Sequence, residues 1–191
     1  MAGIDAAAVT RARTGDREAF RELVERHSRH IFRLAYRMTG NEEDAEDVVQ
    51  ETFLRAYRSL TRFEGQAEFG TWLHRIAANC AIDVMRRRAP ATAAFPIEAV
   101  ETAGNSVETG AAFGDPERDL FAADVRRKLA ASLETLSPME RAAFVLRHFE
   151  GKPVAEIARA LDIRLGAAKN CVFRAVSKLR RELTVLGAET P

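Results

Sequence analysis

Long hydrophobic runs are absent from this sequence of 191 residues. No apolar stretch approaches the roughly 20 residues that a membrane-spanning helix needs, and the N-terminus lacks the basic and then apolar start of a secretory signal. We therefore expect a cytoplasmic protein without membrane insertion. Cysteine is also scarce, because Cys80 and Cys171 are the only two and neither has a partner at C-x-x-C spacing. We expect both thiols to be reduced.

Signatures of catalysis are missing as well. The sequence has no phosphate-binding glycine loop, no nucleophile elbow and no isolated catalytic constellation. His27 and His30 lie at i and i+3, but no cysteine or acidic residue joins them at a known zinc spacing, so we expect surface or packing histidines. Asp44, Glu46 and Asp47 could imitate a metal-binding cluster, yet a solvated face explains them more simply. The sequence predicts no enzyme, cofactor or metal site.

Charge is nearly balanced overall, with a formal net charge of +1, but it is unevenly distributed. Residues 90–119 are rich in Ala, Thr, Pro and Gly, carry more acids than bases and show no sustained apolar period, which indicates a flexible acidic linker. The opposite pattern occurs between Ile163 and Glu182, where six basic residues meet no acid. Such a local electropositive surface on a nearly neutral chain favours a nucleic-acid partner.

Helical periodicity begins after Asp16, a predicted N-cap, and breaks at Gly40, a predicted left-handed C-cap. A second helix follows directly, and its apolar stripe from Ala45 to Leu60 should face a core. On the periodicity alone, its other face is equally a docking patch or a solvated surface. That face places a leucine among charged and amide side chains: Asp47, Gln50, Glu51, Leu54 and Arg58.

A loop is predicted over residues 61–70, and Thr71 can cap a helix that runs to about Arg88. One exposed ridge of this helix suits DNA, because it offers arginines for phosphate, an amide for a base edge and an aromatic ring for stacking. The alternative is a surface helix with Arg–Asp pairs and a buried tryptophan, which Asp83 favours because an acid repels phosphate. The ridge consists of Trp72, Arg75, Asn79, Asp83 and Arg86.

The C-terminal part predicts a helix over residues 122–136 and then a sharp helix start, Ser137-Pro138-Met139-Glu140, with a capping box. A short helix over residues 154–161, a turn over residues 162–164 and a basic helix from Leu165 follow, which is helix-turn-helix geometry. A buried Phe173 is the alternative for the last helix, but its position on the helical wheel is outward. The other outward residues include Asn170, Arg174, Ser177 and Arg181.

The segment from Asp44 to Tyr57, Asp-Ala-Glu-Asp-Val-Val-Gln-Glu-Thr-Phe-Leu-Arg-Ala-Tyr, resembles the most recognisable part of the extracytoplasmic-function (ECF) group of the sigma-70 family. In that family this helix docks on the clamp helices of the beta-prime subunit of RNA polymerase. The resemblance implies a polymerase-binding set of Asp47, Gln50, Glu51 and Leu54.

The stretch from Phe63 to Asn79 is similar to the part of the family that melts and reads the promoter −10 element. There the loop forms a pocket for a flipped base, while the helix follows the DNA strand. The resemblance implies a −10 set of Phe63, Trp72, Arg75, Asn79, Arg86, Arg87 and Arg88. By position, the resemblance implies that Phe63, residues 64–69 and Asn79 make the pocket, and that the other residues of the set hold the DNA backbone.

The last helices resemble the family's second domain, which reads the −35 element in the major groove. The chain has Gly-Ala-Ala-Lys-Asn-Cys over residues 166–171 where the family usually has Gly-Thr-Val-Lys-Ser-Arg, so the −35 sequence that it reads should differ. The resemblance implies a −35 set of Arg147, Lys169, Asn170, Phe173 and Arg174.

We thus expect an all-α fold of two small helical domains, residues 1–89 and 120–191, joined by the flexible linker 90–119. The resemblance implies core RNA polymerase as a partner, at its beta-prime clamp helices and beta flap, together with promoter DNA and an anti-sigma factor. One alternative is a stand-alone helix-turn-helix regulator that binds DNA without polymerase. Another is a related interaction protein that has lost promoter reading.

Overall fold

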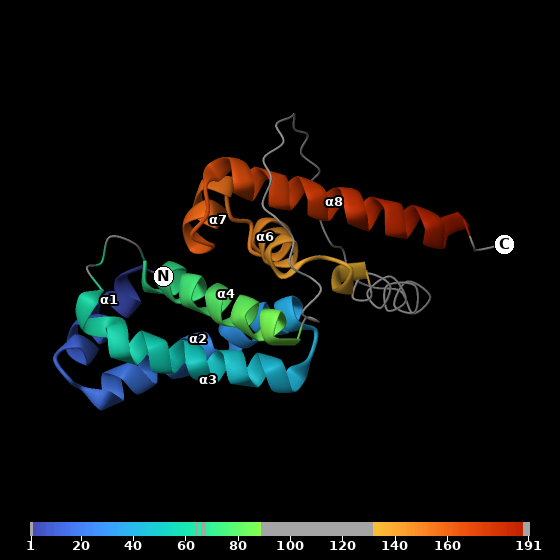
Figure 1. Ribbon diagram of the computed structural model, residues 1–191. Coiled ribbons are helices and arrows are strands. Elements are labelled where there is room, and N and C mark those ends of the chain that lie inside the picture. Colours follow the sequence, from blue (N-terminus) through green and yellow to red (C-terminus); the bar gives the residue numbers. More distant parts are fainter. Residues whose placement is uncertain (1, 64, 66–67, 89–131, 189–191) are drawn as a thin grey trace, which may run out of the picture.

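The computed structural model describes residues 2–63, 65, 68–88 and 132–188, and this part of the chain is helical without a β-strand (Figure 1). The predicted linker 90–119 lies outside the described residues, as does most of the helix predicted over residues 122–136. The helices are α1 (Ala2–Arg13), α2 (Arg17–Thr39), α3 (Glu42–Ser59), the 3-10 helix η1 (Leu60–Arg62), α4 (Phe69–Arg88), α6 (Pro138–His148), α7 (Val154–Ala160) and α8 (Leu165–Ala188).

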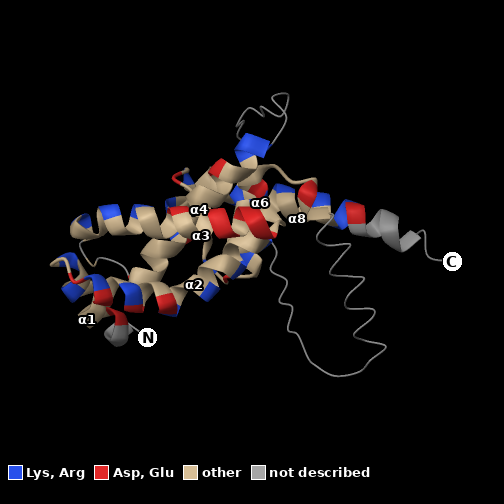
Figure 2. Cartoon of the chain, turned by 90° about the horizontal axis from the view of Figure 1, so that it is seen from below, with Lys and Arg blue, Asp and Glu red and all other residues tan. Residues whose placement is uncertain are grey.

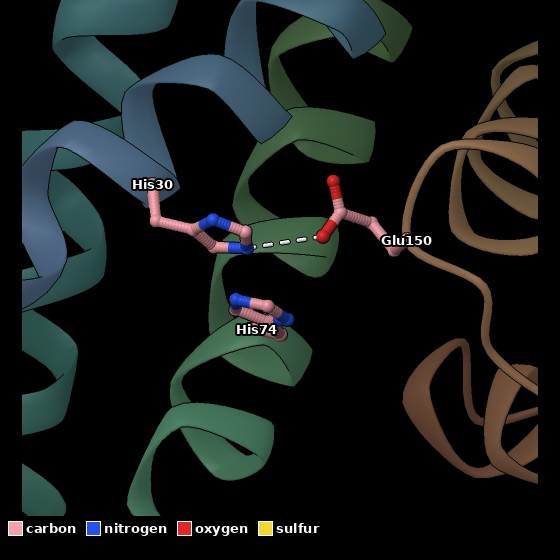
Figure 3. Close-up of side chains that lie close together, drawn as sticks. All are labelled: His30, His74 and Glu150. Carbon is pink, nitrogen blue, oxygen red and sulfur yellow. Dashed lines mark hydrogen bonds and ion pairs between the residues drawn. The ribbon is translucent and has the colours of Figure 1, made fainter. Parts of the chain in front are cut away.

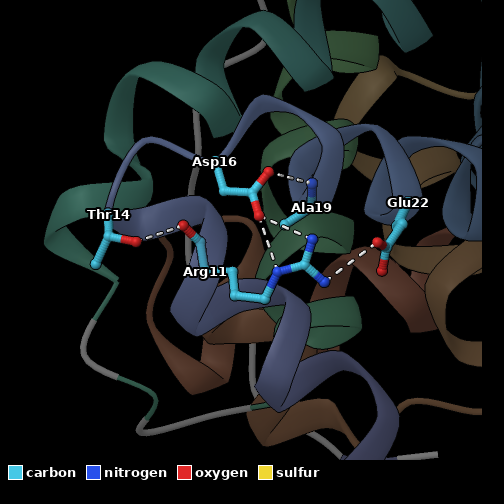
Figure 4. A network of polar contacts seen from close by, with 5 residues as sticks. All are labelled: Arg11, Thr14, Asp16, Ala19 and Glu22. Carbon is cyan, nitrogen blue, oxygen red and sulfur yellow. Dashed lines mark hydrogen bonds and ion pairs between the residues drawn. The ribbon is translucent and has the colours of Figure 1, made fainter.

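The corner between α1 and α2 is held by polar contacts around Asp16 (Figure 4). Asp16 caps α2 and accepts a hydrogen bond from the Ala19 amide at 3.0 Å, so the predicted N-cap is confirmed. Arg11, near the end of α1, pairs with the same carboxylate at 2.8 Å and with Glu22 at 3.3 Å. The Ala19 amide and then Arg11 lower the pKa of Asp16. The residues of the cap therefore also attach α1 to α2.

The sequence did not predict α1, because its apolar residues have almost no helical periodicity. Packing on α2 supports it instead, since Ala8, Val9 and Ala12 are buried. Asp5 adds an ion pair with Arg26 at 2.6 Å and a contact with His27 at 3.0 Å.

Helices α2, α3 and α4 pack against one another into a bundle (Figure 1). Gly40 ends α2 with φ +73°, as predicted, and its amide donates to the Tyr36 carbonyl. Asn41 then caps α3 by accepting from the Asp44 amide at 2.9 Å. The predicted stripe of α3 faces the core, with Val48 and Thr52 fully buried. The α4 helix begins at Phe69, so Thr71 lies inside the helix and the predicted N-cap at Thr71 is wrong.

Helices α6, α7 and α8 form the C-terminal half. The predicted capping box is present: the Ser137 hydroxyl accepts from the Glu140 amide at 3.3 Å, and the Glu140 carboxylate accepts from the Ser137 amide at 3.0 Å. The turn between α7 and α8 contains Asp162 with φ +53°, a left-handed conformation that aspartate tolerates better than most residues. The predicted short helix, turn and long helix are confirmed.

The two halves pack against each other, which the sequence did not predict. α6 lies on α2 and α4, and α7 lies on α4 (Figure 1). Leu146 and Ile157 are buried in the same core as the N-terminal helices. Arg141, only 7% exposed, donates to the Arg37 carbonyl at 3.3 Å and so satisfies the C-terminal end of α2. Burial lowers the pKa of Arg141.

Across the described helices, no segment is long and apolar enough to cross a membrane.

Candidate polymerase and nucleic-acid interfaces

The outward face of α3 carries the predicted docking residues together. Leu54 is 51% exposed, Asp47 and Gln50 are exposed, and Glu51 is half-buried. Acidic residues gather along α3, as the red segments in Figure 2 show. An apolar side chain in an acidic surround suits a partner with its own apolar and basic groups.

A groove of about 550 Å³ borders this face between α3 and α4. Leu54 and Gln50 line one side, and Asp83 and Arg87 of α4 line the other. Arg55 bridges the two helices, because it pairs with Glu51 at 2.6 Å and with Asp83 at 3.4 Å. The hydrogen bond to Glu51 is the main reason why the pKa of Arg55 is raised.

Asp83 is shared between the predicted ridge and the docking groove. On α4 it lies in line with Asn79 and Arg86, as the sequence predicted, and its carboxylate pairs with Arg55 of α3 at 3.4 Å. It therefore adds an acid to the docking groove as well as to the ridge. The signal that it belonged there, its pairing with Arg55, spans 28 positions in the sequence and only packing reveals it.

The predicted −10 residues near the start of α4 form an aromatic cluster. Phe63 is buried, and its ring centroid lies 4.9 Å from that of Trp72 and 6.0 Å from that of Phe69. Trp72 is half-buried, so part of its ring remains accessible. Phe63 and Trp72 line a hollow of about 570 Å³ together with Arg62 and Arg75. Aromatic faces beside guanidinium groups can hold an unstacked base and its phosphate.

The remaining −10 residues lie further along α4. Arg75 and Arg88 are separated by about 20 Å of helix, at a rise of ~1.5 Å per residue. Asn79 is half-buried between these ends, and Arg86 is exposed. Arg88 pairs with the buried carboxylate of Asp44 at 2.8 Å. The predicted set thus follows one helix as an extended track and does not form a single pocket.

The predicted −35 residues lie on or beside the helix-turn-helix. Phe173 is 57% exposed, which rules out the buried alternative. Lys169 and Arg174 are exposed on the same helix, and Asn170 is half-buried. Arg147 projects from α6 and donates to the Lys152 carbonyl at 3.2 Å. The arrangement presents basic side chains and one aromatic ring on a helix, and an α-helix fits into the major groove of DNA.

In the described part of the chain, one group of side chains could hold a metal ion: His30, His74 and Glu150. They lie between the two halves, away from the docking groove of α3.

Comparisons with known proteins agree with this geometry. The family described as Sigma-70 region 2 matches residues 23–90, and the family described as Sigma-70, region 4 matches residues 126–179. The chain is 37% identical over 180 residues to the ECF RNA polymerase sigma factor SigE of Mycolicibacterium smegmatis, covering 93% of this chain and 67% of that protein. It is 30% identical to SigW of Bacillus subtilis, an ECF RNA polymerase sigma factor, covering 92% of this chain and 94% of that protein.

Among solved structures, CnrH in complex with the cytosolic domain of CnrY superposes with a TM-score of 0.63 and 27% identity, covering 97% of this chain and 99% of that chain. The family matches fall on the α2–α4 bundle and on the helix-turn-helix, the two parts that carry the candidate interfaces. The chain therefore belongs to the ECF sigma factors of the sigma-70 family.

Proposed function

We propose that this chain binds core RNA polymerase through the outward face of α3 and directs promoter-specific initiation of transcription. The observation that carries the proposal is Leu54, 51% exposed at the edge of an acidic groove. Leu54 would be the anchor by entering an apolar pocket on the partner. The acidic residues around it would favour a pocket that is bordered by basic side chains. Asp47, Gln50 and Glu51 complete the contact.

In this proposal, residues 1–89 form the domain that docks on core RNA polymerase and opens the promoter DNA. Opening requires that a base leave the stack, which costs a few kcal/mol. Stacking on an aromatic ring returns about 1–3 kcal/mol per base, and Trp72 is the accessible ring beside the hollow. Arg75 and the arginines at the end of α4 would hold the strand. No nucleotide hydrolysis is needed, so the protein acts as a binding factor and not as an enzyme.

Residues 120–191 act as the domain that reads the −35 element. Lys169, Phe173 and Arg174 are exposed on α8, Asn170 is half-buried on the same helix, and Arg147 is exposed on α6. An arginine that reaches a guanine edge gives sequence selection, whereas a lysine near phosphate gives affinity that falls with salt. The segment 90–119 would join the two domains across the polymerase.

An anti-sigma factor and a cytoplasmic location complete the proposal. The solved relative CnrH was captured with the cytosolic domain of another protein, CnrY, and covers almost the whole chain. A similar partner would block the faces described here until a signal releases them. A stand-alone regulator is less well supported, because it would give the exposed Leu54 face and its groove no role.

Two measurements test the proposed function. Gel filtration with core polymerase lacking its specificity subunit should show co-elution. Sequencing the 5′ ends of transcripts made in vitro by that complex should then return a shared promoter motif. Binding to palindromic duplex DNA without any co-elution with core enzyme would contradict the proposal and support the stand-alone regulator.

A further inference from the structure

Three side chains with metal-binding atoms meet where the two halves pack (Figure 3). His30 comes from α2, His74 from α4, and Glu150 follows α6. Their candidate ligand atoms all lie within 4.8 Å of one another. His30 Nε2 is 3.0 Å from Glu150 Oε2, and the two imidazole rings are stacked at 4.6 Å between centroids. The N-terminal half thus supplies two nitrogens and the C-terminal half one carboxylate.

The surroundings leave this cluster ready for a ligand. The Glu150 side chain is only 5% exposed, and His74 Nδ1 is buried without a hydrogen-bond partner in the described part of the chain. Burial and then the neighbouring His30 lower the pKa of His74 to about 4. Leaving this nitrogen of His74 buried and unsatisfied costs stability.

We propose that His30, His74 and Glu150 together bind one Zn²⁺ ion, which ties α6 to α2 and α4. Two imidazoles and one carboxylate form a known zinc donor set, and the fourth position is left for water. Arg37 supports the arrangement, because it holds Glu150 Oε1 at 3.2 Å while Oε2 is directed at His30. Such a contact fixes the orientation of a metal-binding carboxylate.

Binding requires a small rearrangement. Zinc–ligand bonds of ~2.0–2.2 Å place tetrahedral ligand atoms about 3.3–3.6 Å apart. His74 must therefore shift, and its ring must turn out of the stack with His30, for both imidazoles to direct a lone pair at one ion. Arg33 donates to His30 Nδ1 at 3.3 Å, which leaves Nε2 as the donor to Glu150. Zinc replaces that Nε2 proton, the proton moves to Nδ1, and the exposed Arg33 side chain turns away.

An ion at this position would lock the halves together. α7 forms one wall of the hollow that contains Phe63 and Trp72, through Ile157 and Arg159. Zinc would therefore hold α7 over the surface to which we assign −10 recognition. This consequence for DNA rests on the proposed function, whereas zinc binding and closure of the halves do not.

The test is a titration of the metal-free full-length protein with Zn²⁺ in competition with a chromogenic chelator. We expect one bound equivalent, and a loss of about tenfold or more in affinity for His74→Gln and for Glu150→Gln, because each removes a ligand. His148→Gln is the matched control, since it removes an exposed histidine of α6 that lies outside the cluster. It should bind zinc as the unchanged protein does.

A second readout measures closure directly. Amide hydrogen exchange in α6 and α7 should slow with Zn²⁺ in the unchanged protein and not in Glu150→Gln, whose substitution lies in a turn and leaves the helices intact. Equal zinc affinity in the unchanged protein and both ligand variants would overturn the site. Zinc binding without slower exchange would contradict the proposal that the ion ties α6 to α2 and α4. Neither measurement uses polymerase, so failure of the proposed function would remain a separate result.

Discussion

At the scale of single residues, exposure separates the side chains to which we assign binding from those that form the core. Leu54 and Phe173 are large apolar residues that remain more than half exposed, at 51% and 57%. Each lies on a helix whose other face is buried, so neither is needed for the core. Phe63 differs, because its ring is buried under Trp72 and supports the accessible ring. Its loss would act on DNA through the position of Trp72.

Leu54→Asp should weaken binding to core polymerase by about 2 kcal/mol, roughly 30-fold, because it removes the apolar anchor of the docking face. Thermal stability should stay the same, since Leu54 is exposed. Leu165→Asp is the matched control: this leucine is 48% exposed on α8, outside the α3 groove. A competition assay against labelled sigma factor measures both. Equal affinities of the two variants would contradict the docking assignment.

Arg174→Ala should weaken binding to −35 duplex by about 1–3 kcal/mol if its guanidinium reads a base. Binding to duplexes with an altered −35 sequence should then fall less than binding to the preferred one, because selection at one position is lost. Arg21→Ala, an exposed arginine on α2, provides the control. A uniform loss across all duplexes would instead identify Arg174 as a phosphate contact.

At the scale of elements, local signals predicted helix ends well where a cap is present. Asp16, Gly40 and Ser137 were each identified from short-range sequence patterns, and each makes the cap that was predicted. The start of α4 was missed by three residues, and α1 was missed altogether. The apolar residues of α1 have almost no helical periodicity, so its packing on the bundle decides where it forms.

Glu140 illustrates how one capping residue connects two elements. Its carboxylate closes the capping box of α6 and accepts from Lys178 of α8 at 2.6 Å. Burial acts to raise the pKa of Glu140, but the hydrogen bonds from Lys178 and the Ser137 amide outweigh it, and the pKa is lowered. The carboxylate therefore stabilises the folded protein above its ordinary pKa of 4.5, and this stability is lost as the pH falls below that value.

Glu140→Gln should lower the free energy of unfolding by about 1–2 kcal/mol near neutral pH, because the charged hydrogen bond to Lys178 is lost while the amide can still close the box. The difference between the variant and the unchanged protein should shrink below about pH 4. Urea unfolding at several pH values measures it. A difference that does not change with pH would show that the charge of Glu140 is irrelevant.

At the scale of the whole molecule, the contact between the halves is the feature with the most consequences. It buries Leu146 and Ile157 in a common core, places Arg141 on the end of α2 and brings Glu150 to His30. Arg37 also lies over the Phe149 ring at 4.8 Å. These contacts place α7 beside the hollow of the −10 residues. The C-terminal half therefore forms one side of that hollow.

Gly40→Ala should loosen this contact. A Cβ at Gly40 would meet Arg141 Nη2 at 2.9 Å, so the side chain that holds α6 on α2 must move. Gly15→Ala is a matched control, because Gly15 also has a positive φ and its Cβ would meet nothing within 4 Å. Both variants should lose about 1 kcal/mol of stability from backbone strain. Only Gly40→Ala should speed hydrogen exchange in α6, and equal exchange in both would contradict the role of Arg141.

The sequence by itself determined the helices with clear caps or periodicity and the outward faces of α3 and α8. The residues on these faces also indicated the family of the chain. Those features depend on hydrogen bonds and side-chain spacing within a few turns of one helix. Only the tertiary structure decided that Asp83 joins the docking groove, that α7 walls the −10 hollow and that His30 meets Glu150 across 120 positions. Such encounters depend on how whole helices pack, and no local pattern encodes them.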